Sequence, residues 1–231
     1  MKRKSYLAAI MGLCALACVL QVGAAQSDNW TVYRVLAMMD KAAGEFHSLT
    51  ANVEHIKYTA VVQDSSSETG QMFVRRDQKM RIDFTKPDPR TILRSGDLLF
   101  IYTPKIKRVE EYNLDKNRAM VDQYLSLGFG TKSQNVRKSY EVTLSGQEEI
   151  DKRNSFLLEL TPKSEEVRKQ ITKVQMWIDP SSWLPVQQKF FEAGSGDYLL
   201  IKYSGMMKNL KISDSKFKPD WPKDVTRVRP R

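Results

Sequence analysis

The sequence predicts an α+β fold that is mainly β, with about ten or eleven strands in a large antiparallel sheet and two or three helices on one side of it. Apolar residues recur with a period of two in many segments between Leu49 and Tyr203, whereas helical spacing is confined to two short stretches. Turn residues separate these segments, as expected for strands joined by hairpins.

The chain begins with a pattern typical of a secretory signal peptide. Lys2, Arg3 and Lys4 precede an apolar stretch from Leu7 to Leu20 that ends in small residues near Ala25. This stretch is shorter than the roughly 20 residues that a membrane-spanning helix needs. We therefore expect cleavage after Ala25, leaving residues 26–231 as a single exported domain.

Both cysteines, Cys14 and Cys18, lie in the segment that cleavage would remove. The mature chain would then have neither a disulfide nor a thiol nucleophile, and packing alone would stabilise it. A lipidated N-terminus at Cys18 is the alternative, but the residues before Cys18 match a lipoprotein cleavage site poorly.

The first helix is expected between Trp30 and Phe46, where apolar residues recur at steps of three and four. Ser27 or Asp28 is a candidate cap. After Ser48 the period changes to two, and the apolar positions switch parity within the run that ends at Val62, which predicts a bulge in a long strand.

A polar loop over Gln63–Thr69 is expected next, followed by a strand from Gly70 to Arg76. The segment from Lys79 to Thr85 alternates most clearly, with Met80, Ile82 and Phe84 on its apolar face. A turn at Pro87 leads to a second apolar run, Leu98–Tyr102.

Helical spacing returns from Met120 to Leu125, with Gly128 and Gly130 where this second helix would stop. Strand patterns fill most of the rest of the chain, and Asp179-Pro180-Ser181 and Gly194-Ser195-Gly196 have the composition of turns. The proline-containing tail from Lys218 is expected to be extended and loosely held.

The sequence lacks the residue patterns of common enzymes. His47 and His55 are the only histidines, and neither has the neighbours needed for a metal site, so we expect packing or surface roles. Nucleophile-elbow, phosphate-loop and zinc-protease motifs are missing. We therefore expect no cofactor, no metal and no enzymatic activity, although a site assembled from distant residues stays open.

The formal net charge of +10 offers two readings. A basic exported protein meets anionic membranes or acidic partners more readily than nucleic acid, so we expect no nucleic-acid partner. Alternatively, the charges only keep the protein soluble.

Strand parity places Arg76 beside the apolar face that carries Met72 and Val74. On the residues alone, Arg76 can be an edge arginine that reaches out to water. Likewise, the apolar set Met72, Val74, Met80, Ile82 and Phe84 can be ordinary core.

The order of several short motifs resembles the LolA-like family of outer-membrane lipoprotein carriers. The motifs are Gly70–Arg76, Met80–Asp83, Pro87, Ser95–Asp97, Tyr102 and Pro104, and, further on, Trp177–Asp179, Leu184-Pro185, Tyr203, Asn209 and Phe217. This series covers nearly all of the mature chain. The sequence departs from the pattern at Asp77, where a proline commonly follows the arginine, and in a longer segment around Leu125–Lys138.

The resemblance implies an incomplete antiparallel barrel whose concave face is covered by helices acting as a lid. It implies a cavity for lipoprotein acyl chains lined by Met72, Val74, Met80, Ile82, Phe84 and Phe100. It also implies that Arg76 hydrogen-bonds the lid shut. Methionines suit such a cavity because their side chains adapt to chains of different shape.

The implied function is a periplasmic carrier, expected as a monomer, that moves acylated lipoproteins from the inner to the outer membrane. Its partners would be an inner-membrane ABC-type exporter and an outer-membrane acceptor. A sensor or regulator with the same fold is an alternative, although such regulators usually carry a second domain. A carrier of another lipid is a further alternative.

Overall fold

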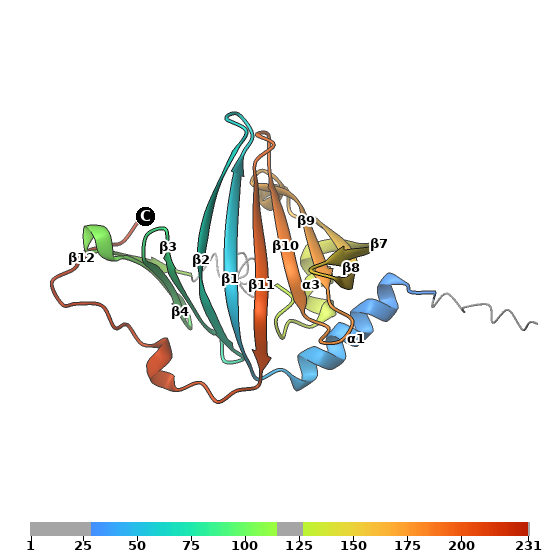
Figure 1. Cartoon of the computed structure of the whole chain (residues 1–231), viewed down its shortest axis with the longest axis horizontal. Helices are drawn as coiled ribbons and strands as arrows, with labels where there is room; N and C mark the ends of the chain where they lie inside the picture. The colour runs from blue at the N-terminus through green and yellow to red at the C-terminus, as the bar shows by residue number, and fades with distance from the viewer. Residues whose placement is uncertain (1–28, 115–126, 231) are drawn as a thin grey trace, which may run out of the picture.

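The computed structural model describes residues 29–114 and 127–230, which form one open 12-stranded sheet (Figure 1). The strands are β1 (Ser48–Thr59), β2 (Asp64–Arg75), β3 (Lys79–Lys86), β4 (Arg90–Ser95), β5 (Leu98–Thr103), β6 (Arg108–Asn113), β7 (Tyr140–Ile150), β8 (Arg153–Pro162), β9 (Ile171–Ile178), β10 (Pro185–Glu192), β11 (Tyr198–Lys208) and β12 (Thr226–Val228). Their order is β12-β6-β5-β4-β3-β2-β1-β11-β10-β9-β8-β7.

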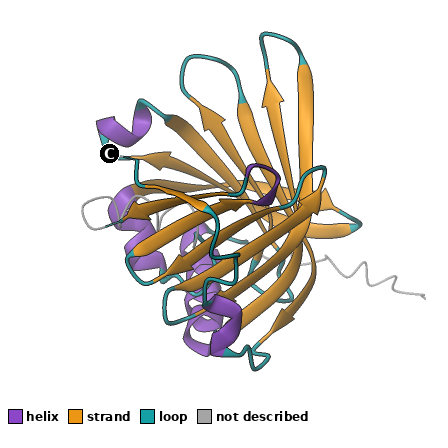
Figure 2. Ribbon diagram, turned by 90° about the vertical axis from the view of Figure 1, so that its left-hand side faces the viewer, coloured by secondary structure: helices purple, strands orange, loops and turns teal. Residues whose placement is uncertain are grey.

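Neighbouring strands are antiparallel except for β12 and β6, which run parallel. The sheet curves without closing, so the mainly β, incomplete barrel that was predicted is confirmed. Figure 2 shows how the strands curl around the side on which the helices gather.

The described helices are α1 (Val32–Glu45), α3 (Ser133–Ser139) and α4 (Glu165–Arg168), with 3-10 turns η1 (Pro104–Ile106) and η3 (Asp214–Phe217). Helix α1 forms where the spacing predicts it, and Thr31 caps it by accepting a hydrogen bond from the Arg34 backbone amide at 3.3 Å. Among these helices, none is long and apolar enough to span a membrane.

Several expectations fall on residues outside the described ranges. They are the signal peptide with Cys14 and Cys18, the candidate caps Ser27 and Asp28, and the second helix from Met120 to Leu125.

The expected loop over Gln63–Thr69 is wrong, because these residues are largely strand. β2 begins at Asp64 and pairs without interruption with β1, from Thr59 opposite Asp64 to Ser48 opposite Arg75. The serine-rich start of β2 carries no apolar pattern, so its strand structure comes from this backbone pairing and not from side-chain burial.

The expected bulge in the first long strand is also misplaced. β1 keeps one register with β2, so its odd-numbered residues from Leu49 to Lys57 all share the concave face. The register shift lies instead between β1 and β11, where Thr50 pairs with Met207 and Asn52 with Ser204. The extra residue therefore belongs to β11, and the apolar Ile56 and Tyr58 lie on the convex face.

The C-terminal tail is not loosely held, contrary to expectation. It crosses the convex face and ends in β12, which pairs with β6. Phe217 and Val225 are buried against Leu93 and Phe100, and the Trp221 ring lies 5.4 Å from the ring of Phe100. The prolines predicted a loosely held tail, but Trp221 and Val225 between them cover the convex surface of β4, β5 and β6.

Ion pairs fasten the same tail to β2 and β3. The Arg81 side chain, only 7% exposed, contacts Asp83 at 2.7 Å and Asp220 at 2.9 Å. Arg75 contacts Asp77 at 2.7 Å and Asp214 at 2.5 Å. These pairs satisfy the buried guanidinium of Arg81, which would otherwise destabilise the fold.

We expect Phe217→Ala to lower the free energy of unfolding by about 3–5 kcal/mol, because it removes a buried aromatic side chain from the convex core. The matched control is Leu210→Ala in the same tail, where the residue is 46% exposed and the change should stay within about 0.5 kcal/mol. Chemical denaturation measures both values. Equal, small losses would mean that the tail contributes little to stability.

Candidate functional site

The concave face carries most of the predicted cavity residues. Met72, Val74, Met80, Ile82 and Phe84 point to this face and are between 2% and 5% exposed. They pack in one cluster with Leu36 and Met39 of α1 and with Leu127 and Phe129 of the segment before α3. The protein therefore covers these side chains itself in the structure described.

Phe100 lies elsewhere. Strand pairing aligns Phe100 with Leu93 and Arg81, which face the convex side, and Phe100 packs there with Phe217. The predicted assignment of Phe100 to the concave cavity is therefore wrong. The run from Leu98 to Tyr102 is apolar at every position, so its sequence carries no alternation that could tell one face from the other.

An open cavity of about 440 Å³ lies farther along the same concave face, beyond Phe84. Its floor is apolar and comes from four strands, β4, β9, β10 and β11. The residues that line it are His55, Lys57, Ser66, Glu68, Arg90, Ile92, Ile171, Phe190, Glu192, Leu199 and Ile201. We call it the upper cavity, because its lining includes Lys57 and Ser66, which lie near the hairpin between β1 and β2. Figure 1 shows this hairpin at the top of the sheet.

The charged side chains at the rim of the upper cavity are paired with one another. Lys57 contacts Glu192, and Arg90 contacts Glu68. The Arg90 guanidinium also lies over the Phe84 ring, 4.9 Å from its centroid. The rim is therefore close to neutral, which suits an apolar ligand better than a charged one.

His55 stands between the covered core and the upper cavity. Its ring meets the Phe84 ring edge-on with the centroids 4.8 Å apart. Burial disfavours the charged imidazolium and Arg90 repels it, so the pKa of His55 falls from 6.5 to about 4. At neutral pH His55 is therefore an uncharged part of the cavity wall.

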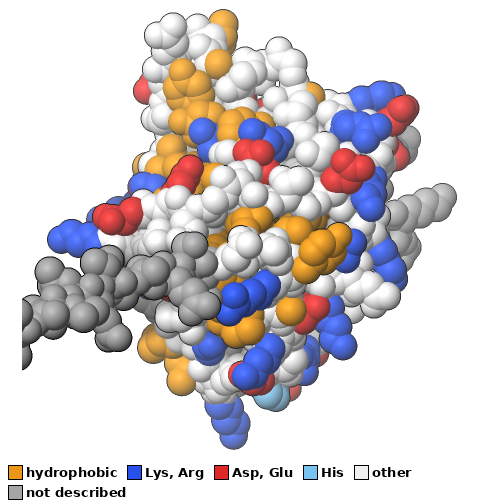
Figure 3. All heavy atoms as spheres, turned by 90° about the vertical axis from the view of Figure 1, so that its right-hand side faces the viewer, with side chains coloured by type: hydrophobic (Ala, Val, Ile, Leu, Met, Phe, Trp, Pro, Cys, Tyr) orange, Lys and Arg blue, Asp and Glu red, His pale blue; other side chains and the backbone are white. Residues whose placement is uncertain are grey.

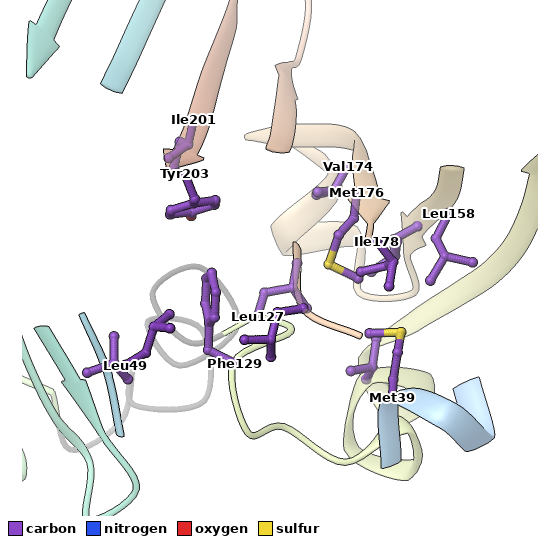
Figure 4. Packing of buried hydrophobic residues seen from close by; sticks show 14 of the residues in the cluster. Met39, Leu49, Leu127, Phe129, Leu158, Val174, Met176, Ile178, Ile201 and Tyr203 are labelled. Atoms are coloured by element: carbon purple, nitrogen blue, oxygen red, sulfur yellow. The ribbon is translucent and has the colours of Figure 1, made fainter. Parts of the chain in front are cut away.

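A partition closes the lower end of the upper cavity. Ile201 of β11 lines the cavity, and Tyr203 lies two residues farther along the same strand. The Tyr203 ring meets the Phe129 ring edge-on, with the centroids 5.0 Å apart (Figure 4). The Tyr203 hydroxyl donates to Gln188 at 2.7 Å, and the Gln188 amide donates to the Leu127 carbonyl at 3.0 Å. Burial raises the pKa of Tyr203, so its hydroxyl keeps its proton and remains a donor.

Glycines let the partition segment approach the sheet. Gly128 has a φ of +83°, and a Cβ at this position would lie 2.5 Å from the Pro185 ring. Gly130 has a φ of +70°, and its Cβ would lie 2.7 Å from the Phe46 ring. Larger residues would push Leu127 and Phe129 away from the concave face.

A second cavity, the lower pocket, lies on the other side of the partition and has a volume of about 790 Å³. Its lining combines apolar and basic side chains from the end of α1, from β2 and β4, and from the segment leading into α3. The residues are Ala43, Gly44, Phe46, Val74, Arg75, Arg76, Gln78, Arg94, Leu127, Phe129, Gly130, Thr131, Lys132, Asn135, Val136, Ser139 and Tyr140.

Arg76 joins the sheet to α1. Its Nη2 donates to the carbonyls of Ala43 at 2.5 Å and Gly44 at 3.0 Å, which belong to the last turn of the helix. A guanidinium is favourable there because the last helical carbonyls carry partial negative charge and need donors. Arg76 therefore hydrogen-bonds the end of α1, and its role as a latch stays a prediction.

Sequence analysis predicted cavity residues that do not line the upper cavity. It missed Ile92, Phe190, Leu199 and Ile201, which line the upper cavity. Phe190, Leu199 and Ile201 lie on strands that the sequence predicts, whereas Ile92 lies on β4, which was not predicted. Only the order of the strands in the sheet brings these residues together. In the described ranges no group of three or more His, Cys, Asp or Glu could hold a metal ion.

Comparison with known proteins identifies the family but not an activity. A family model described as "Uncharacterized protein" matches residues 56–216, so the chain belongs to that family. No curated protein matches the chain in sequence.

Solved structures show where else this fold occurs. An uncharacterized conserved protein from Thermus thermophilus has a TM-score of 0.56 and 11% identity, over 86% of this chain and 98% of the other. MucB has a TM-score of 0.50 and 11% identity, over 81% of this chain and 62% of MucB. A LolA superfamily protein from Nitrosomonas europaea has a TM-score of 0.42 and 18% identity, over 82% of this chain and 98% of the other.

We expect the pKa of His55 to make the protein lose stability as the pH falls. The unfolded chain binds a proton at His55 near pH 6.5, whereas the folded protein does so only near pH 4, so stability is lost progressively across this interval. Lys57, Glu68, Arg90 and Glu192 face the same cavity and are present in wild type and variant alike.

The measurement compares wild type with His55→Gln by chemical denaturation at a series of pH values. The free energy of unfolding of the wild type should fall more steeply on acidification than that of the variant. Parallel curves would contradict the low pKa of His55.

Proposed function

We propose that this protein is a periplasmic carrier that shelters the acyl chains of lipoproteins against its concave face. The observation that carries the proposal is the upper cavity, an apolar space of about 440 Å³ that the described side chains leave open. Its size falls in the range of roughly 300–1,000 Å³ that is typical of small-molecule sites.

The physical need for such a carrier follows from the hydrophobic effect. Each methylene that leaves water gains about 0.8 kcal/mol, so a long acyl chain does not cross an aqueous compartment unaided. A protein that binds the chain must also release it. Release then requires an acceptor that binds the chain better, together with a conformational change that opens the site.

The covered core next to the upper cavity is the proposed extension of the site. Met72 and Met80 lie there beside Met39 of α1, and methionine side chains can repack around an incoming chain. In this proposal α1 is the lid and Arg76 is its latch, because the two contacts from Arg76 fix the last turn of α1. Val74, Ile82 and Phe84 would then join the lining.

The cargo would come from an inner-membrane ABC-type exporter and pass to an outer-membrane acceptor, with the carrier acting as an exported monomer of one domain. The resemblance of the Gly70–Arg76 and Met80–Asp83 motifs to the LolA-like family supports this assignment. A carrier of another lipid would use the same cavity.

A second candidate is a sensor that binds a protein partner. The likeness to MucB supports this candidate at the level of the fold, although the chain spans 62% of the length of MucB. The two functions differ in what the upper cavity does, since a carrier must load and release hydrocarbon.

We expect Leu199→Trp to reduce the binding of a fluorescent fatty acid by at least about tenfold, because the larger side chain fills part of the apolar floor. Leu200→Trp is the matched control, since Leu200 is the next residue of β11 and faces the convex side. Fluorescence titration gives both affinities, and native mass spectrometry without detergent reports bound lipid. Equal binding by both variants would remove the upper cavity from the site.

We expect Arg76→Leu to change the rate of cargo release with little loss of fold, because it removes two hydrogen bonds from the exposed end of α1. Cargo should be retained longer, or its transfer impaired. Lys41→Leu on the exposed side of α1 serves as the control. Transfer of a fluorescent acyl chain to acceptor vesicles measures the rate, and an unchanged rate would exclude the latch.

A further inference from the structure

The two cavities of the concave face differ in charge. The upper cavity has two basic and two acidic side chains at its rim, and they pair with one another. The lower pocket has four basic side chains, Arg75, Arg76, Arg94 and Lys132, and its described lining contains neither Asp nor Glu. An excess of positive charge beside apolar side chains is a feature of sites that bind anionic amphiphiles.

Two of the four basic side chains are engaged elsewhere. Arg75 is held by Asp77 and Asp214, and the Arg94 Nε donates to the Gly96 carbonyl at 3.3 Å. The candidate anion contacts of the lower pocket are therefore Arg76 and Lys132. Arg76 directs Nη2 to the end of α1, and a guanidinium has five N–H donors, so its other edge can serve an anion.

The backbone fixes both residues at the pocket. The Arg76 amide donates to the His47 carbonyl at 2.9 Å. Lys132 precedes Ser133, whose amide and hydroxyl both donate to the Asp40 carboxylate at 2.6 Å. Helices α1 and α3 are thus tied together at the rim of the pocket, and the Asp40 carboxylate accepts two hydrogen bonds from Ser133.

Phe46, Val74 and Phe129 form an apolar floor next to these charges. A ligand that satisfied both parts of the pocket would have an anionic group and a hydrocarbon chain. Figure 3 shows that Lys and Arg side chains are also spread widely over one face of the molecule, which favours approach of anions in general. The lower pocket differs from that surface because its charges adjoin buried hydrocarbon.

We propose that the lower pocket binds the anionic head group, a phosphate or a carboxylate, of an amphiphile whose hydrocarbon contacts Phe46, Val74 and Phe129. This inference deepens the proposed carrier function, because it names the class of lipid that the concave face would hold. It also couples ligand binding to the position of α1, the proposed lid, since an anion at Arg76 would compete with the Ala43 and Gly44 carbonyls for the same guanidinium.

The experiment compares three probes on the full mature chain by calorimetry: dodecyl phosphate, dodecylphosphocholine and inorganic phosphate. Dodecyl phosphate should bind at least about tenfold more tightly than the zwitterionic dodecylphosphocholine, and its affinity should fall as salt is added. Binding by inorganic phosphate at the same affinity would identify a free anion, and not a lipid head group, as the ligand of the site.

Lys132→Gln tests whether Lys132 contacts the anion. Its matched control is Lys138→Gln, because Lys138 is an exposed lysine of α3, the helix that directly follows Lys132. We expect Lys132→Gln to weaken the binding of dodecyl phosphate by about three- to tenfold and to leave the affinity for dodecylphosphocholine unchanged. Lys138→Gln should change neither affinity. Both lysines are exposed, so the fold should persist, and circular dichroism checks this.

The results separate this inference from the proposed function. Equal affinity for the two dodecyl probes, or equal effects of the two lysine variants, would overturn the anion site while leaving the carrier proposal in place. Loss of dodecyl phosphate binding in Lys132→Gln but not in Leu199→Trp would support the anion site even if the upper cavity takes no acyl chain.

Discussion

The constraint on which this structure depends is that a single large sheet has two apolar faces, and each must be covered. On the convex side the C-terminal tail does this with Phe217, Trp221 and Val225. On the concave side α1, α3 and the Leu127–Phe129 segment cover the part of the sheet around Met72 and Met80. The rest of the concave face lacks such a cover among the described residues, and the upper cavity is the result.

The segments that cover the concave face pack through apolar side chains, and a few polar contacts also hold them in place. Arg76 holds the last turn of α1, Asp40 holds the start of α3, and Gln188 holds the partition. Apolar packing is non-directional and tolerates repacking, whereas a buried hydrogen bond has one geometry and is costly to leave unmade. These contacts therefore fix the covered arrangement, and in the proposed carrier the covered core would become accessible when they break.

The sequence predicted the fold class well because alternation on β3 is clean and its partners are local hairpins. It could not assign Phe100 to a face, since a strand that is apolar at every position shows no alternation. Nor could it predict the start of β2, whose serines carry no apolar pattern and whose strand structure comes from pairing with β1. It also predicted a loosely held tail from its prolines, although Trp221 and Val225 between them pack against distant strands. Long-range pairing and tail docking are tertiary effects, and local propensity does not contain them.

The charge distribution argues that the two cavities have different tasks. At the upper cavity each rim charge has a partner of opposite sign, so entry of hydrocarbon disturbs no unpaired ion. At the lower pocket the described partners of the Arg76 side chain are helix carbonyls, which are weaker partners for a guanidinium than a carboxylate or phosphate. An anion arriving there would gain more than the helix loses, and α1 would be released at the moment when the neighbouring core is needed. The lid contact and the ligand contact would then be alternatives for one side chain, which gives the fold a direct physical link between loading and opening.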